Sequence, residues 1–247
     1  MNKKSVKIVM FLVIITVVII ILQLFISMNT VYIGNNTRVI SIGSKIYKYN
    51  KNKKIILKKI KVYKDGRTVK GFLKSTKADN EIEYHLVSSS NKKIDMKTVI
   101  ASGQMVKLSV VDRTKDINTI NDTLLNELND MLDTELKIEN VSRYNKITYD
   151  IDNDSIDEQV LYVSYLKDNI SVDRIFIYDD NLIDVVDYEF DYKDVMNLSQ
   201  KAYDFVGLID FNNDNKYEVV VSRVDGDSHP AYYDIYSYEN GIVKEIK

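Results

Sequence analysis

The sequence predicts a mainly β protein with an N-terminal transmembrane helix, and three observations predict it. An apolar run occupies 8–26, β-type alternation fills 31–115, and strand-like segments recur at a fixed offset within 145–247. With 45% hydrophobic and 28% charged residues, the 247-residue chain has the composition of a folded protein. We therefore expect a membrane helix, a small antiparallel β domain, a connecting helix at 116–140 and two blade-like four-stranded antiparallel β repeats.

The N-terminal segment 1–26 has the features of a signal anchor. Three lysines lie within 1–7, and the apolar run 8–26 contains only two polar residues. A helix of this length spans about 28 Å, close to the hydrocarbon thickness of a bilayer. The run exceeds the apolar core of a signal peptide and no small-residue cleavage motif follows, so an uncleaved anchor is favoured over a cleaved signal peptide. The positive-inside rule then makes 1–7 a cytoplasmic tail and places the rest outside the cytoplasm, at the cell membrane.

Charge divides the chain into a basic and an acidic half. Residues 1–115 carry 23 Lys/Arg against 6 Asp/Glu, or +17, and residues 116–247 carry 11 against 30, or −19, which sum to the net charge of −2. A split of this size suggests two domains with different partners. The absence of cysteine excludes disulfides, thiolate metal sites and a cysteine nucleophile.

The basic region 31–115 is predicted to form the small antiparallel β domain. Alternating β-prone runs occupy 55–63, 68–73, 81–87 and 106–111. Asp65-Gly66 between two of them is a hairpin signal, and His85 in a strand pattern is interpreted as structural. Alternating lysines are typical of a solvated sheet face; the alternative is a patch for an anionic cell-wall polymer or lipid head groups. Nucleic acid is not an expected partner, because no aromatic-interleaved basic motif is present.

The periodicity changes at the start of the acidic half. Apolar residues recur at helical spacing at Ile117, Ile120, Leu124, Leu128 and Met131. This amphipathic pattern predicts a helix within 116–140, with Asp116 as its N-cap. The stretch is too short for a coiled coil, so we expect the helix to pack on a sheet or to bridge the two domains.

An acidic nonapeptide occurs twice, beginning at positions 150 and 210. The copies are Asp150-Ile-Asp152-Asn-Asp154-Ser-Ile-Asp-Glu158 and Asp210-Phe-Asn212-Asn-Asp214-Asn-Lys-Tyr-Glu218. Side-chain oxygens at loop positions 1, 3, 5 and 9 are spaced to surround a hard cation such as Ca²⁺. The flanking residues correspond at the same offset, so each repeat, at about 145–190 and about 205–247, is predicted to be a strand, the acidic loop, a longer strand and a hairpin.

These residues resemble the FG-GAP or VCBS-type repeats of integrin α-subunit propellers and bacterial surface proteins. The resemblance covers about residues 145–247 and implies β blades whose loops bind Ca²⁺. It assigns to the first site Asp150, Asp152, Asp154, Glu158 and the carbonyl of Ile156. It assigns to the second site Asp210, Asn212, Asp214, Glu218 and the carbonyl of Lys216.

The chain departs from the family pattern in two respects. The glycine at loop position 6 is replaced by Ser155 and Asn215, and the Phe-Gly and Gly-Ala-Pro signatures that name the family are absent. Because serine tolerates the left-handed conformation less well than asparagine, we expect the first loop to be distorted. Two repeats cannot close a propeller, so we expect strands from 31–115 to complete the assembly.

The sequence contains no recognisable catalytic constellation. His229 and Ser228 are neighbours in a Gly-containing loop, whereas catalytic triads are assembled from distant segments. We therefore predict a membrane-anchored, extracytoplasmic binding or scaffold protein, not an enzyme, with an envelope protein or wall polymer as partner. The alternative is a cell-wall-associated enzyme or accessory factor with a polymer-binding basic domain, which converging acids in a cleft would favour.

Overall fold

The computed structural model describes most of the chain. The described residues are 3–33, 37–42, 45–49, 59–64, 67–78, 81–88, 93–94, 100–102, 108–111, 116–191, 201–225 and 232–247. The expected turn at Asp65-Gly66 and the loop with His229 lie outside these residues, as does the side chain of His85.

The elements follow the order expected from the sequence. The N-terminal half contains α1 Lys3–Met28, β1 Thr30–Ile33, β2 Thr37–Ile42, β3 Lys45–Tyr49, β4 Lys59–Lys64, β5 Arg67–Ala78, β6 Glu81–Ser88, β7 Lys93–Ile94, β8 Ile100–Ser102 and β9 Ser109–Val110. The connector contains α2 Asp122–Leu132 and the 3-10 helix η3 Ile138–Asn140. The first repeat contains β10 Val141–Tyr149, β11 Glu158–Lys167, β12 Ile170–Asp179 and β13 Asn181–Asp191. The second repeat contains β14 Lys201–Asp210, β15 Glu218–Asp225, β16 Tyr232–Glu239 and β17 Ile242–Glu245.

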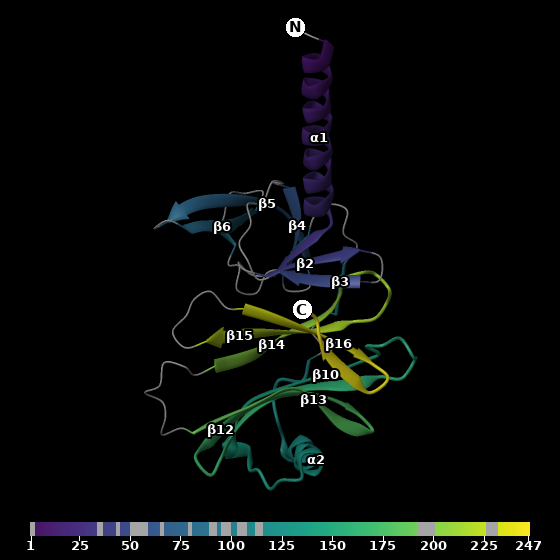
Figure 1. Cartoon of the computed structure of the whole chain (residues 1–247). Coiled ribbons are helices and arrows are strands. Elements are labelled where there is room, and N and C mark those ends of the chain that lie inside the picture. The colour runs from purple at the N-terminus through teal and green to yellow at the C-terminus, as the bar shows by residue number, and fades with distance from the viewer. Residues whose placement is uncertain are drawn as a thin grey trace.

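In the described part of the chain, three antiparallel sheets and the helices α1 and α2 stack along one axis (Figure 1). The N-terminal sheet has the strand order β3-β2-β1-β8-β4-β5-β6-β7, the first-repeat sheet β10-β11-β12-β13, and the second-repeat sheet β17-β16-β15-β14-β9. From α1 the layers are the N-terminal sheet, the second-repeat sheet, the first-repeat sheet and α2 (Figure 1). This arrangement confirms the predicted fold class.

Both faces of each repeat sheet are covered, which explains the continuous apolar runs of β11 and β15. Between the repeat sheets lie Ile147, Ile151, Val160, Tyr162, Ile175, Phe205, Leu208, Val219 and Val221, among others. The alternate residues Leu161 and Val163 pack on the side of α2. Val220 packs on the other side, against the N-terminal sheet. Burial on both faces stabilises the sheets by about 25 cal/mol for each Å² of apolar surface removed from water.

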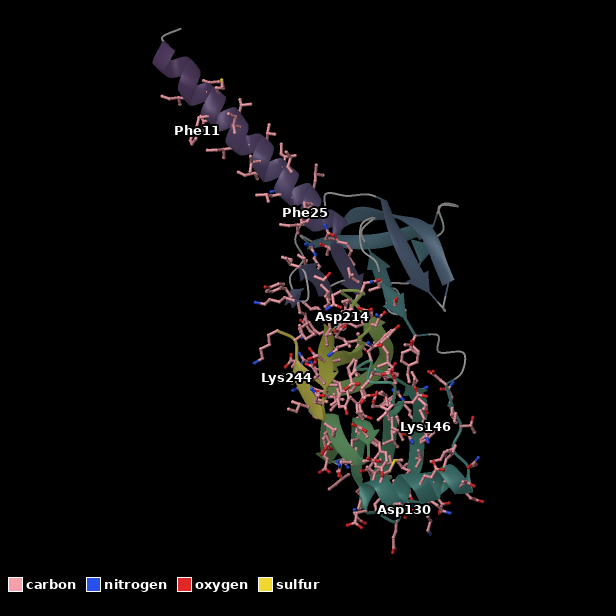
Figure 2. The ribbon with its side chains drawn as sticks, turned by 90° about the vertical axis from the view of Figure 1, so that its right-hand side faces the viewer. Phe11, Phe25, Asp130, Lys146, Asp214 and Lys244 are labelled. Carbon is pink, nitrogen blue, oxygen red and sulfur yellow. The ribbon has the colours of Figure 1, made fainter. Side chains whose placement is uncertain are left out.

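The connecting helix caps the outer face of the first-repeat sheet. It is shorter than 116–140, and the expected N-cap at Asp116 is wrong: Asn121 is the N-cap, accepting a hydrogen bond from the Leu124 N–H at 2.9 Å. The residues before it follow the edge of β10, where Ile117 forms a bridge with Lys146. Because the backbone there bonds to a strand, it cannot begin a helix. Figure 2 shows Asp130 of α2 at the end of the molecule opposite α1.

The second-repeat sheet is completed by a strand from the N-terminal half. Ser109 and Val110, within the predicted run 106–111, pair antiparallel with Asp210 and Ile209 at the start of the second acidic loop. This confirms that residues from 31–115 contribute to the repeat assembly. The face of this sheet that points away from the first repeat packs on Val31 and Ile33 of β1.

A buried ion pair joins the basic and acidic halves. Lys48 on β3 places its Nζ 3.0 Å from Asp234 Oδ1 and 3.2 Å from Glu245 Oε1, and the side chains of Lys48 and Asp234 are only 5% and 6% exposed. Arg223 approaches the other Asp234 oxygen at 3.2 Å. Loss of one partner would leave a buried charge without compensation, so the pair fixes how the N-terminal sheet sits on the second repeat.

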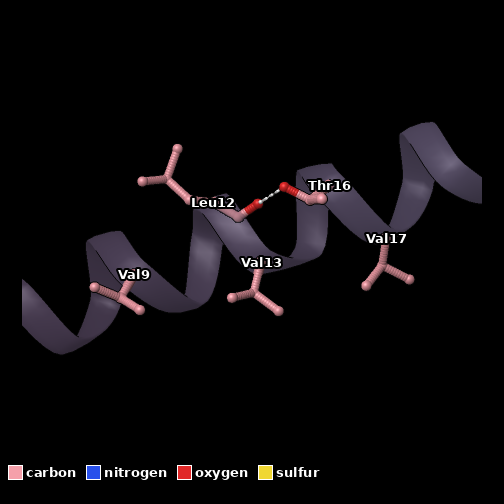
Figure 3. Close-up of a pocket in the computed structure, with 5 residues that line it drawn as sticks. All are labelled: Val9, Leu12, Val13, Thr16 and Val17. Atoms are coloured by element: carbon pink, nitrogen blue, oxygen red, sulfur yellow. Dashed lines mark hydrogen bonds between the residues drawn. The ribbon is translucent and has the colours of Figure 1, made fainter.

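Helix α1 could serve as a membrane anchor or a signal sequence. Its segment Ile8–Ile26 is 19 residues long with a mean hydropathy of 3.2, and none of it is buried in the protein. The hydroxyl of Thr16 donates to the carbonyl of Leu12 at 2.9 Å, so this polar group is satisfied within the helix (Figure 3). A single residue, Asn29, separates α1 from the buried strand β1.

Candidate metal centre

The first acidic loop lies between β10 and β11 and gathers three carboxylates. One oxygen from each of Asp150, Asp152 and Glu158 lies within 4.8 Å of the others, so the three could hold a metal ion. Asp150 follows the end of β10 and Glu158 begins β11, so the ends of two paired strands bring these residues together. Asp154, the fourth expected side-chain ligand, is not in this group.

Backbone hydrogen bonds fix the shape of the first loop. The Asp150 carboxylate accepts from the Asp154 N–H at 3.1 Å and the Ser155 N–H at 3.0 Å. Glu158 Oε2 accepts from the buried Ile151 N–H at 2.8 Å. Asp152 Oδ1 is buried and has no hydrogen-bond partner among the residues that the structure describes. A buried carboxylate oxygen without a partner is costly, and a cation is the kind of group that would satisfy it.

The second loop has the same frame with different side chains. Asp210 is 1% exposed and accepts hydrogen bonds from the N–H groups of Asn212, Asn213, Asp214 and Asn215. Glu218 Oε2 accepts from Phe211 N–H at 3.3 Å, as Glu158 does from Ile151 in the first loop. At position 3, however, the Asn212 amide donates to Asp214 Oδ2 at 2.8 Å. The second loop thus has a hydrogen-bond donor at position 3, where the first loop has the carboxylate of Asp152.

The two loops also differ in formal charge. Residues 150–158 contain five acids and no base, or −5, whereas residues 210–218 contain three acids and one lysine, or −2. The lysine, Lys216, forms an ion pair with Glu239 at the tip of the β16–β17 hairpin. The first loop therefore has the greater need for an external cation.

The expected distortion of the first loop is wrong. Ser155 has φ 75° and Asn215 has φ 67°, and at loop position 4 Asn153 and Asn213 have φ 64° and 59°. Both copies thus use the left-handed conformation at the same two positions. The hydrogen bond from the residue at position 6 to the first Asp, present in both loops, stabilises this conformation at Ser155 as well as at Asn215.

The carboxyls at loop position 9 have strongly raised pKa values. Burial raises the pKa of Glu158 to about 7, with Asp152 and Asp154 adding to the rise and the Ile151 N–H opposing it. Burial likewise raises the pKa of Glu218 to about 8. A divalent cation favours the ionised form, so metal binding at either glutamate would be coupled to proton release near neutral pH.

The sequence did not reveal the contacts between the two loops. The Tyr217 N–H of the second loop donates to the Ile151 carbonyl of the first at 2.7 Å. The rings of Tyr149 and Tyr217 meet edge to face with centroids 4.9 Å apart. The Asn240 N–H of the second repeat donates to Asp152 Oδ2 at 3.4 Å. Such contacts depend on the stacking of the sheets, for which the spacing of residues gives no signal.

The structure therefore brings only some of the predicted ligands together. It brings Asp150, Asp152 and Glu158 together, while Asp154 Oδ1 accepts a hydrogen bond from the Ile156 N–H at 2.8 Å. Ile156 and Lys216, whose carbonyls the resemblance assigns, occupy equivalent positions before β11 and β15. Figure 2 shows Asp214 of the second loop on the side that faces the N-terminal sheet.

Two surface pockets offer no acidic lining. One follows α1 and is lined by Val9, Leu12, Val13, Thr16 and Val17 (Figure 3). The other lies at the edge of β10 and is lined by residues that include Asn118, Arg143 and Tyr144.

Comparison with models of known protein families, with curated proteins and with solved structures found no match.

Proposed function

We propose that this chain is a single-pass membrane protein whose extracytoplasmic β repeats bind Ca²⁺ at the first acidic loop and form a platform for a binding partner. The observation that carries the proposal is the triad Asp150, Asp152 and Glu158, which includes a buried oxygen without a hydrogen-bond partner. The resemblance of the loop to FG-GAP or VCBS-type repeats supports the same ion.

The ligand chemistry favours Ca²⁺ over other metals. The cluster offers only carboxylate oxygens, and the further ligand that the resemblance assigns, at Ile156, is a backbone carbonyl. Hard oxygen ligands suit Ca²⁺ and Mg²⁺ rather than Zn²⁺ or copper. A loop that supplies several oxygens from one short segment fits the large, flexible coordination sphere of Ca²⁺ better than the strict octahedron of Mg²⁺.

The ion would act mainly by stabilising the repeat assembly. It would replace repulsion among three clustered carboxylates with attraction, at the corner where β10 passes into β11. Because only the folded loop gathers these ligands, binding would stabilise the folded chain by about 2.7 kcal/mol at a Ca²⁺ concentration 100 times the dissociation constant. A rigid stack of sheets would then present its loops and edges to a partner in the cell envelope.

The anchor would hold this platform at the outer surface of the membrane. Lys3, Lys4 and Lys7 precede the span and favour a cytoplasmic N-terminus. The Asn29 N–H bonds to the carbonyls of Phe25 and Ile26 at 3.2 Å each, so the helix end is satisfied directly before β1. The short junction would keep the N-terminal sheet close to the bilayer.

Cysteine labelling tests the orientation, because the natural chain has no cysteine. We expect a membrane-impermeant maleimide to label Asn126→Cys, an exposed position on α2, in intact cells. Ser5→Cys, before the span, should react only after the membrane is permeabilised. Two results would contradict the signal anchor. One is labelling of Ser5→Cys in intact cells, and the other is an extracted chain from which cleavage has removed Ser5.

A further inference from the structure

The tip of the β16–β17 hairpin reaches the first loop from the other repeat. Asn240 and Gly241 form this tip with φ values of 51° and 74°, the left-handed pair of a tight turn. The tip brings the Asn240 N–H to Asp152 Oδ2 at 3.4 Å, although the two residues are 88 positions apart. The metal centre thus lies at the contact between the two repeats.

Because of this contact, the two oxygens of Asp152 have different surroundings. Oδ2 faces the Asn240 N–H, whereas Oδ1 is buried and, within the described part of the chain, has no hydrogen-bond partner. A ligand whose second atom is held by an outer hydrogen bond has a fixed orientation, and such outer partners commonly tune metal affinity by about tenfold or more. The Asn240 N–H is such a partner for Asp152.

Further bonds hold the hairpin in place. The Tyr238 hydroxyl donates to Asp179 Oδ2 on the first repeat. Glu239 pairs with Lys216 of the second loop, and the neighbouring Tyr217 N–H donates to the Ile151 carbonyl at 2.7 Å. The hairpin therefore bonds to the first repeat through Tyr238 and Asn240 and to the second loop through Glu239, so its position depends on how the two repeats dock.

We propose that the hairpin tip of the second repeat positions Asp152 in the ion site of the first loop, so that calcium binding and docking of the repeats are coupled. This inference rests on the proposed calcium function. The coupling is reciprocal: docking raises the affinity for the ion, and the ion strengthens docking by the same factor. Calcium then acts between the repeats as well as within one loop.

Two substitutions at the tip form a matched pair. Gly241 has φ 74°, and a Cβ there would meet no atom within 4 Å. Substitutions at this position therefore differ mainly in the backbone strain that they cause. Valine is β-branched and strongly disfavours this conformation, whereas asparagine tolerates it. With the full chain in detergent, we expect Gly241→Val to weaken Ca²⁺ binding about tenfold and Gly241→Asn to change it less than about twofold, measured by calorimetric titration.

A second variant and a second measurement guard against simple misfolding. Tyr238→Phe keeps the buried ring but removes the bond to Asp179, and we expect it to weaken Ca²⁺ binding about threefold. In the wild-type chain, Ca²⁺ should slow hydrogen exchange at the Asn240 and Tyr217 amides. A merely structural tip would lower the melting temperature in EDTA without changing the affinity.

The outcomes separate the two proposals. If Gly241→Val and Tyr238→Phe bind Ca²⁺ as tightly as the wild-type chain does, and exchange at Asn240 is unaffected by Ca²⁺, the positioning role is overturned while the calcium function stands. If the wild-type chain does not bind Ca²⁺ at all, the calcium function fails and the positioning role falls with it.

Discussion

The first and second acidic loops have the same backbone path but balance their charge differently. Both place left-handed residues at positions 4 and 6, and both use the final glutamate to accept an N–H from the residue after the first Asp. In the second loop the Asn212 amide donates to Asp214, and Lys216 supplies a positive charge that pairs with Glu239. The first loop has Asp152 in place of Asn212 and Ile156 in place of Lys216, and one buried oxygen of Asp152 has no partner in the described residues.

The difference indicates that the two copies of the loop have different roles: the second mainly stabilises the fold, and the first also offers a site for an ion. The second loop behaves as a self-sufficient turn in which Asp210 accepts hydrogen bonds from successive N–H groups. The first loop keeps the same turn but leaves a cluster of acids that an ion would complete. Under the proposed function, the second corner holds the sheet together and the first corner also binds the ion.

The largest effect is expected from removing the first Asp of each loop. Asp210→Ala should lower the free energy of unfolding by about 2–4 kcal/mol in EDTA, because several N–H groups lose a charged acceptor. Asp150→Ala should cost less in EDTA but abolish the stabilisation by Ca²⁺, which Asp210→Ala retains. Thermal melting of both variants with EDTA and with millimolar Ca²⁺ checks this, and equal responses to Ca²⁺ would remove the distinction between the loops.

The next effect concerns pH, through the glutamates at position 9. The pKa of Glu158 is raised to about 7 and that of Glu218 to about 8 from an ordinary value of 4.5. Between the ordinary and the raised pKa, each carboxyl is therefore protonated in the folded chain and ionised in the unfolded chain. The stability they contribute is therefore complete below the ordinary pKa of a glutamate and is lost as the pH rises through the two raised values.

Melting in EDTA between about pH 5 and pH 9 tests this sign. We expect the melting temperature of the wild-type chain to fall with rising pH, and Glu218→Gln to flatten the upper part of the fall. Saturating Ca²⁺ should remove the part that belongs to Glu158 and leave the part that belongs to Glu218. A melting temperature that rises over this range would contradict the burial argument.

The smallest effect is expected at loop position 6. Ser155 has φ 75°, where serine is disfavoured, so Ser155→Gly should raise the free energy of unfolding by about 0.5–1 kcal/mol. Asn215→Gly, at φ 67°, should change it by less than about 0.5 kcal/mol, because asparagine already tolerates this conformation. Denaturant unfolding in EDTA measures both, and a larger gain at Asn215 would reverse the comparison.

Local patterns predicted the repeats well because they depend on residues close in the chain. The offset between the two nonapeptides placed both loops between strands, and β14 and β15 follow β10 and β11 at this same offset. Alternation identified the hairpin of β4 and β5, whose pairing the structure confirms.

Long-range pairing explains what local patterns missed. Asp116 was expected to cap the helix, but its neighbour Ile117 pairs with Lys146 on β10 and the helix begins later. The expected distortion at Ser155 did not occur, because the Asp150 carboxylate accepts its N–H. The meeting of Asn240 with Asp152 depends on two sheets stacking, which no single segment encodes.

Calorimetric titration of the full chain with Ca²⁺ tests the central claim most directly. We expect the wild-type chain to bind Ca²⁺, Asp152→Asn to weaken binding at least about tenfold, and Asp214→Asn, in the second loop, to change it less than about twofold. Absence of binding in the wild-type chain, or equal binding in Asp152→Asn, would show that the first loop is not the calcium site.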